Sequence, residues 1–112
     1  METNVKDLDT PGFEEAIEKD KPILIDFWAD WCVPCKMTTP QVEAVSKERA
    51  DVDFAKVNTD ESMDVAAAYD IRSIPTFIIF QSGEEVARHT GAINKTQINQ
   101  FIDSAMELTK EV

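Results

Sequence analysis

The segment Ile23–Trp28 places the strongest limit on the fold of this 112-residue chain. It is apolar throughout except for Asp26. A nearly continuous apolar run of this length is typical of a central strand that is covered on both faces. Because the rest of the sequence alternates strand-like and helix-like segments, we expect a layered α/β domain built around this strand.

The only two cysteines of the chain, Cys32 and Cys35, follow that strand with Val33 and Pro34 between them. We expect Cys32 where the strand ends and Cys35 in the first turn of the next helix, where unpaired N–H groups and the helix dipole favour a thiolate. Since the thiolate is the nucleophile in disulfide exchange, the spacing favours a reversible disulfide. The alternative is half of a zinc site, but such a site needs four ligands and His89 is the only histidine.

Four landmarks spread over nearly the whole chain resemble the thioredoxin family, and they occur in the family's order. They are the active-site segment Phe27–Met37, the Ile-Pro-Thr loop Ile71–Thr76, the hairpin turn Ser82-Gly83 and the late glycine of Gly91-Ala92. Two positions depart from the family pattern. Val33 replaces the usual glycine between the cysteines, and Ser73 replaces a frequent glycine before the proline loop.

The expected elements agree with the thioredoxin fold. Thr10 is expected to cap a first helix, Asp60 to cap a short third helix, and Asn94–Gln97 to form a capping box for the last one. The resemblance implies one α/β domain over residues 1–112. Its central mixed sheet would have five strands in the order 1-3-2-4-5, flanked by four helices.

The resemblance also assigns roles to individual residues. It implies that Cys32 is exposed and attacks a partner disulfide, and that Cys35 then resolves the mixed disulfide. Desolvation in an apolar strand should raise the pKa of Asp26, and the resemblance places this residue behind Cys35 as a proton acceptor, with the amine of Lys56 nearby. The alternatives are a solvent-facing Asp26 and, for Lys56, a solvated charge at a strand end.

An apolar platform for substrate is expected around Cys32. The resemblance implies a cis peptide bond before Pro75, and the backbone of Ile74 would pair with an extended substrate segment. Val33 has two interpretations: its isopropyl group narrows the approach to Cys32, or it is a neutral surface substitution. The expected platform consists of Trp31, Val33, Pro34, Ile74, Pro75, Gly91 and Ala92.

These features favour a protein-disulfide reductase that acts by dithiol–disulfide exchange. A cation between the cysteines would stabilise the thiolate, and hence the reduced form, and would make the disulfide a stronger oxidant. Pro34 adds no cation and therefore supports the reducing direction. The resemblance implies a separate thioredoxin reductase, dependent on flavin and NADPH, that restores the dithiol. No bound cofactor is expected, since the three glycines form no glycine-rich fingerprint. The alternatives are an oxidase or isomerase of an oxidising compartment and a redox-independent interaction module.

The charge of the chain limits its partners. Twenty-two acidic and eleven basic side chains give a net charge of −11, which repels phosphate backbones and anionic lipid, so neither nucleic acid nor a membrane is an expected partner. The acidity fits a salty cytosol, a basic partner or simple solubility. Met1–Asp7 lacks the pattern of a secretory signal. We therefore expect a cytoplasmic monomer that acts on disulfide-containing client proteins.

Overall fold

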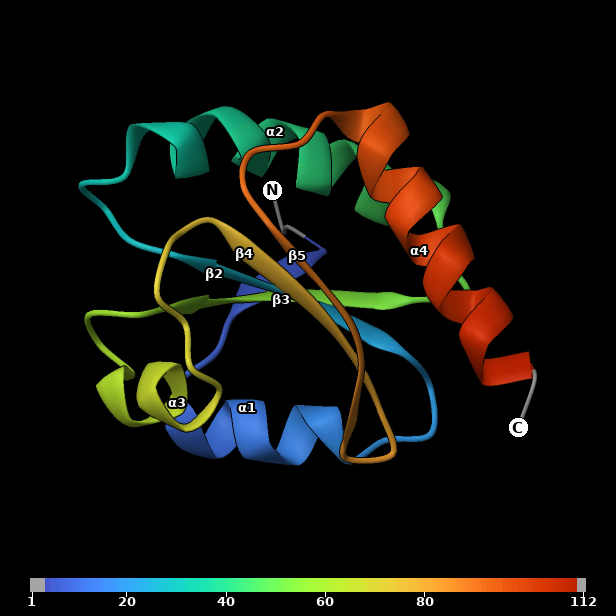
Figure 1. Ribbon diagram of the computed structural model, residues 1–112, viewed down its shortest axis with the longest axis horizontal. Coiled ribbons are helices and arrows are strands. Elements are labelled where there is room, and N and C mark those ends of the chain that lie inside the picture. Colours follow the sequence, from blue (N-terminus) through green and yellow to red (C-terminus); the bar gives the residue numbers. More distant parts are fainter. Residues whose placement is uncertain (1–3, 111–112) are drawn as a thin grey trace.

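The computed structural model describes residues 4–110 (Figure 1). Strands and helices alternate up to a final hairpin and helix, as the sequence predicted. The elements are β1 (Val5–Asp7), α1 (Thr10–Ile17), β2 (Ile23–Trp28), α2 (Val33–Glu48), β3 (Asp53–Asn58), α3 (Met63–Ala68), β4 (Thr76–Gln81), β5 (Glu84–Thr90) and α4 (Lys95–Lys110). None of the helices within these residues is long and apolar enough to cross a membrane.

The five strands form one mixed sheet in the order β1-β3-β2-β4-β5, which confirms the predicted order. Strands β1 and β2 both run parallel to β3, whereas β4 runs antiparallel to β2 and to β5. Figure 1 shows α2 and α4 on one face of the sheet and α1 and α3 on the other. The sheet is therefore covered on both sides, and β2 lies at its centre.

Strand β2 supplies apolar side chains to both faces of the sheet. Leu24 packs with Val42 and Val45 of α2, and Ile25 and Phe27 pack in the separate cluster on the α1 face. All five side chains are 0–1% exposed. Burying each of them contributes about 1.5–3 kcal/mol relative to an exposed side chain. Because β2 is fixed on both faces, the segment that follows it is held in a defined place.

Two predicted helix caps have opposite outcomes. The cap of α1 is Asp9 instead of Thr10: an Asp9 carboxylate oxygen accepts a hydrogen bond from the backbone N–H of Gly12 at 2.9 Å. Asp and Thr are both good N-cap residues, so residue type alone does not show which of the neighbours Asp9 and Thr10 caps the helix. The capping box of α4 is confirmed, since Asn94 and Gln97 each accept a hydrogen bond from the other's backbone N–H at 2.9 Å.

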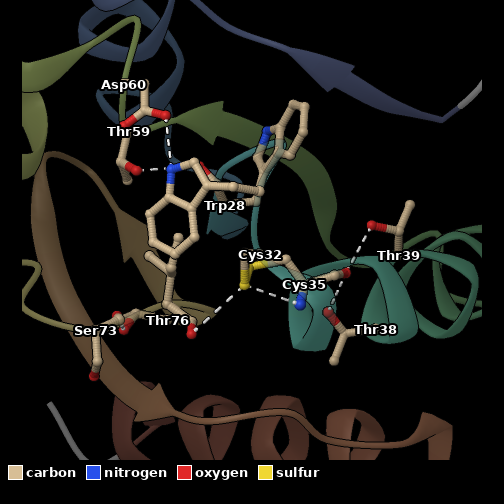
Figure 2. The surroundings of a disulfide bond; sticks show 11 residues. Trp28, Cys32, Cys35, Thr38, Thr39, Thr59, Asp60, Ser73 and Thr76 are labelled. Carbon is tan, nitrogen blue, oxygen red and sulfur yellow. Dashed lines mark hydrogen bonds between the residues drawn. A yellow bond between two sulfur atoms is a disulfide. The ribbon is translucent and has the colours of Figure 1, made fainter.

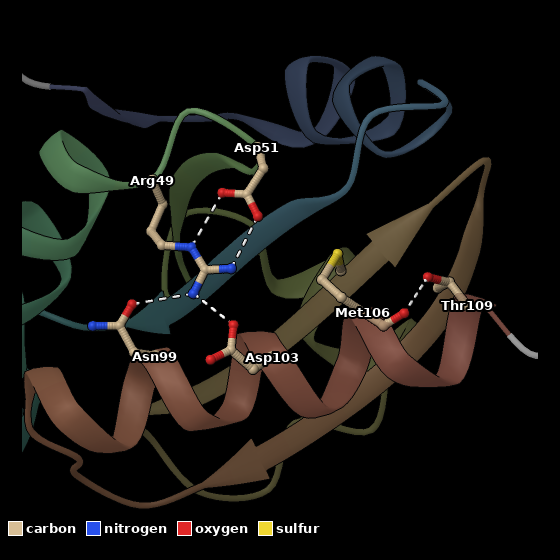
Figure 3. Close-up of polar contacts among 6 residues, drawn as sticks. All are labelled: Arg49, Asp51, Asn99, Asp103, Met106 and Thr109. Atoms are coloured by element: carbon tan, nitrogen blue, oxygen red, sulfur yellow. Dashed lines mark hydrogen bonds and ion pairs between the residues drawn. The ribbon is translucent and has the colours of Figure 1, made fainter.

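Arg49 joins the C-terminal end of α2 to α4 (Figure 3). Its guanidinium donates to Asp51 at 2.9 and 3.1 Å, to Asp103 at 2.8 Å and to the Asn99 amide oxygen at 3.3 Å. The Arg49 side chain is only 18% exposed, so solvent screens these contacts less than it screens a fully exposed ion pair. We call this group the Arg49 clamp; it fastens α2 at the end opposite to the cysteine pair.

Candidate active site

Cys32 and Cys35 form a disulfide at the start of α2 (Figure 2). Cys32 is the N-cap residue of this helix, Cys35 lies in its first turn, and their Cα atoms are 5.3 Å apart. The backbone N–H of Cys35 donates to Cys32 Sγ at 3.1 Å. Since the start of a helix is also the positive end of its dipole, the site stabilises negative charge on the Cys32 sulfur once the disulfide is reduced.

Neither cysteine of the disulfide is open to solvent. Cys32 is 3% exposed and Cys35 is 1% exposed, so the expectation of an exposed Cys32 is wrong for the oxidised protein. The physical reason is that Cys32 Sγ is bonded to Cys35, which is itself buried, and lies 3.8 Å from the carbonyl oxygen of Ile74. A reacting partner must therefore make close contact with the surface around Cys32 to reach the sulfur.

Two threonines that no sequence motif marks bind the backbone of the second cysteine. The hydroxyl groups of Thr38 and Thr39 donate to the carbonyl oxygen of Cys35 at 2.9 and 3.0 Å, as Figure 2 shows. Thr38 is buried and Thr39 is partly buried. The Cys35 carbonyl oxygen, in the first turn of α2, thus accepts hydrogen bonds from two side-chain hydroxyl groups.

Trp31 is exposed beside the disulfide, yet its indole is not free. The side chain is 69% exposed, and Nε1 donates to Asp60 Oδ2 at 2.9 Å. Asp60 does not cap α3 as predicted; the cap position belongs to Ser62, which makes no side-chain cap bond. Asp60 lies earlier in the loop, where its own N–H donates to the Asn58 side chain and its carboxylate reaches Trp31. No sequence pattern signals a contact between two loops.

The loop before β4 lies against the disulfide, as expected. The Ile74–Pro75 peptide bond is cis, which confirms that prediction, and the Ile74 carbonyl oxygen faces Cys32. The next loop is joined to this one, because the N–H of Gly91 donates to the Pro75 carbonyl oxygen at 2.9 Å. Gly91 has a φ of 110°, a conformation that side chains disfavour. Glycine at this position therefore lets the second loop reach the first.

Most residues of the predicted apolar platform are exposed at the surface. Val33 is 66% exposed, Trp31, Pro34 and Ala92 are also exposed, and Ile74 and Gly91 are partly exposed. Pro75 is buried, so its contribution is to shape the loop and not to offer surface. Solvent-exposed apolar side chains that gather in one patch are a common mark of an interaction site.

Met37, which is not among the predicted platform residues, extends this surface. Its side chain is 69% exposed. Residues four apart on a helix lie on the same side, so Met37 is next to Val33 on α2. The spacing of four residues between Val33 and Met37 could have predicted from the sequence that Met37 belongs to this surface. Trp31 also lines a pocket, together with Thr59, Ile71, Arg72, Ser73 and Ile74.

Asp26 is buried in the centre of the sheet, on the face that α2 covers. Its side chain is 1% exposed, and burial raises its pKa from 3.8 to about 7, while Lys56 lowers it and Asp7 raises it further. Oδ1 of Asp26 has no hydrogen-bond partner among residues 4–110. The alternative of a solvent-facing Asp26 is therefore wrong. A carboxyl group with this pKa can take up or release a proton near neutral pH.

Lys56 lies directly beside Asp26, since the two residues are register partners on β3 and β2. Its Nζ lies 4.7 Å from the centre of the Trp28 ring, an arrangement that attracts a cation to the face of the indole. Lys56 is therefore partly buried and held in place, and is not the solvated strand-end charge of the alternative interpretation. Among the described residues there is no group of three or more His, Cys, Asp or Glu side chains that could hold a metal ion.

Comparisons of the sequence identify relatives of this chain. A family model described as Thioredoxin matches residues 4–104. The thioredoxin of Mycoplasma pneumoniae is 43% identical over 102 residues, which covers 91% of this chain and 98% of the relative. The thioredoxin of Porphyra purpurea is 44% identical over 91 residues, or 80% of this chain and 85% of the relative.

Solved structures agree with the sequence comparisons. The thioredoxin of Malassezia sympodialis superposes with a TM-score of 0.85 and 34% identity, covering 93% of this chain and 92% of the other. A mutant thioredoxin of Halobacterium salinarum gives a TM-score of 0.82 and 30% identity, covering 94% of each chain. This chain therefore belongs to the thioredoxin family: it has the thioredoxin fold and is a protein-disulfide reductase that works by thiol–disulfide exchange through Cys32 and Cys35.

Proposed function

We propose that Cys32 is the attacking nucleophile of this reductase and Cys35 the resolving thiol. The observation that carries the assignment is the hydrogen bond from the Cys35 N–H to Cys32 Sγ at the start of α2, because it favours the thiolate of Cys32. The Cys32 thiolate attacks one sulfur of a client disulfide, forms a mixed disulfide and expels the other client sulfur as a thiolate. Cys35 then attacks Cys32 Sγ, which forms the Cys32–Cys35 disulfide and releases the second client sulfur.

The second step requires that Cys35 lose a proton, and we assign Asp26 as the acceptor. Asp26 is buried on the face of the sheet that α2 covers, and its pKa of about 7 allows it to be ionised near neutral pH. Lys56 stabilises the carboxylate before the transfer, since its positive charge lowers the pKa of Asp26. The client takes up two electrons and two protons and leaves as a dithiol. The present protein is left with its Cys32–Cys35 disulfide.

The platform around Cys32 supports binding of an extended client segment. Trp31, Val33 and Pro34, next to Cys32 in the chain, offer exposed apolar surface, and the Ile74 carbonyl oxygen lies 3.8 Å from Cys32 Sγ. In this arrangement the Ile74 backbone pairs with the client main chain, while the side chains of the platform cover the client's apolar residues. Gly91 and Ala92 complete the edge of this surface.

Membership of the family implies a reductase and client proteins as partners. We infer that the reductase is a flavin- and NADPH-dependent thioredoxin reductase. We further infer that the chain acts as one domain and as a monomer in the cytoplasm, where the dithiol form is maintained. The redox group is the Cys32–Cys35 disulfide itself.

The test of the cysteine roles uses two single variants. Cys32→Ser should abolish reduction of insulin disulfides, because no nucleophile remains to form the mixed disulfide. Cys35→Ser should accumulate a mixed disulfide between Cys32 and the client, which mass spectrometry of a digested sample would locate. Full multiple-turnover activity of Cys35→Ser, or trapping of clients by Cys32→Ser, would show that the roles are reversed.

A further inference from the structure

A row of alternating charges crosses three neighbouring strands beneath α2. In the register of the sheet, Asp7 of β1 is the partner of Lys56 on β3, and Lys56 is the partner of Asp26 on β2. Directly paired residues of adjacent strands project their side chains to the same face of a sheet. Lys56 therefore stands between the exposed carboxylate of Asp7 and the buried carboxyl group of Asp26.

Trp28 links Asp7, at one end of this row, to Lys56 in its middle. It follows Asp26 by two residues on β2, so it lies on the same face. Its indole Nε1 donates to Asp7 Oδ1 at 3.2 Å, and the ammonium group of Lys56 lies 4.7 Å from the centre of its ring. Asp7 thus holds the indole on which the Lys56 cation rests. The disulfide-exchange steps described above use Asp26 and Lys56 but give no role to Asp7.

We propose that Asp7 is a positioning residue of the redox site, which acts on the proton acceptor Asp26 through its own charge and through Trp28 and Lys56. Its carboxylate opposes ionisation of Asp26, and its hydrogen bond keeps Trp28 under the Lys56 ammonium, which favours that ionisation. The two effects set the pH above which Asp26 accepts the proton of Cys35. This inference rests on the proposed role of Asp26.

The groups that face Asp26 come from four elements. Strand β3 brings Lys56, β1 brings Asp7 and β4 brings the uncharged Phe77 as register partner. Helix α2 turns its buried side, with Cys35 and Thr38, toward this face of the sheet. Besides burial, Lys56 and Asp7 are the charges that shift the pKa of Asp26, in opposite directions.

The first test measures the Asp26 carboxyl directly in the oxidised protein, where the cysteines do not titrate. Asp7→Asn removes the charge but keeps an oxygen that can accept the Trp28 hydrogen bond. The NMR titration midpoint of Asp26 should fall by about half a pH unit, the size expected for a charge two strands away near the surface. The matched control is Asp53→Asn, a carboxylate at the other end of β3 paired with Lys21, which should leave the midpoint unchanged.

The second test follows the resolving step against pH. In single-turnover stopped flow with a symmetric chromogenic disulfide, release of the second coloured thiol reports the attack by Cys35. The acidic limb of this rate should move to lower pH in Asp7→Asn and return in Asp7→Glu. In an Asp26→Asn background, Asp7→Asn should have no effect on the profile, because the group through which Asp7 acts is absent.

The outcomes distinguish the positioning role of Asp7 from the proton-acceptor role of Asp26. An Asp26 midpoint and a pH profile that both stay fixed in Asp7→Asn would overturn the role of Asp7. A profile that still shifts in the Asp26→Asn background would also overturn it, since Asp7 would then act on the thiols without Asp26. If Asp26→Asn alone leaves the acidic limb in place, the proposed acceptor role of Asp26 fails instead.

Discussion

A carboxyl group in the centre of a sheet links folding to pH, and Asp26 is such a group. Its pKa is about 7 in the folded protein against an ordinary value of 3.8. Between these two values the unfolded chain has released the proton while the folded chain still holds it. The free energy of unfolding therefore falls as the pH rises from about 4 to 7 and levels off above 7, where both states are ionised.

Asp26→Asn should remove this dependence, because the amide carries no charge at any pH in the range. The variant should be more stable than the natural protein at pH 8 by up to about 4 kcal/mol, and the two should differ little near pH 4. Urea unfolding of the oxidised proteins at both pH values measures the difference. A constant offset at all pH values would mean that Asp26 is not protonated in the folded state at neutral pH.

Val33→Gly tests whether the side chain between the cysteines limits access to Cys32. Val33 is 66% exposed and follows Cys32 directly, so its isopropyl group lies at the entrance to a sulfur that is itself buried. The glycine variant should react faster with bulky folded disulfide proteins, by up to about tenfold, and at nearly the same rate with small disulfides. Rate constants for both substrate classes, with the redox potential of each variant, decide the matter. Equal changes in both classes would refute the steric explanation.

At the scale of elements, the exposed side of α2 forms part of the client surface. Met37 lies one turn beyond Val33, whereas Met63 is equally exposed at the start of α3, on the opposite face of the sheet. Met37→Gln should lower kcat/KM for protein disulfides severalfold, because a polar amide replaces apolar contact area. Met63→Gln is the matched control and should have no effect.

The redox potential should be the same in both methionine variants, since neither side chain bonds to a sulfur. Equal losses of kcat/KM in Met37→Gln and Met63→Gln would indicate a general effect on folding. An unchanged kcat/KM for protein disulfides in Met37→Gln would show that the client surface is limited to the residues nearer Cys32.

The elements themselves were predictable because their signals are periodic or local. Ile23–Trp28 has the apolar run of a central strand, and Asn94–Gln97 carries both halves of a capping box, so each was recognised without tertiary information. Asp26 was recognised as buried because every neighbour in its strand is apolar.

What was missed depends on contacts between segments far apart in the chain. The sequence predicts a helix cap at Asp60 because Asp commonly begins helices, whereas its carboxylate bonds to Trp31 across two loops. The resemblance implies an exposed Cys32, but in the disulfide Cys32 is 3% exposed and its Sγ lies 3.8 Å from the Ile74 carbonyl oxygen. The position of Asp7 beside Lys56 depends on the register of β1 against β3, which a strand of three residues does not specify by its sequence.

At the scale of the whole molecule, a net charge of −11 surrounds a small apolar platform. Long-range attraction should therefore favour clients that carry positive charge near their disulfide. Of two peptides with the same disulfide, a lysine-flanked one should react faster than a glutamate-flanked one at low ionic strength. The difference should shrink in molar salt, where the screening length falls to about 3 Å. Stopped-flow rates at several salt concentrations measure it, and a preference that persists in high salt would point to a local contact instead.

One end of α2 carries the redox-active cysteine pair, and the Arg49 clamp holds the other end. Reduction opens a loop of only a few residues between Cys32 and Cys35, and we expect the Arg49 clamp at the other end of α2 to stay in place. Amide hydrogen exchange in the last turns of α2 should therefore be slow in both redox states, with differences confined to the first turn. We therefore expect the reduced form that binds a client and the oxidised form that binds the reductase to have nearly the same backbone. The two redox states would differ in only a few atoms at the start of α2.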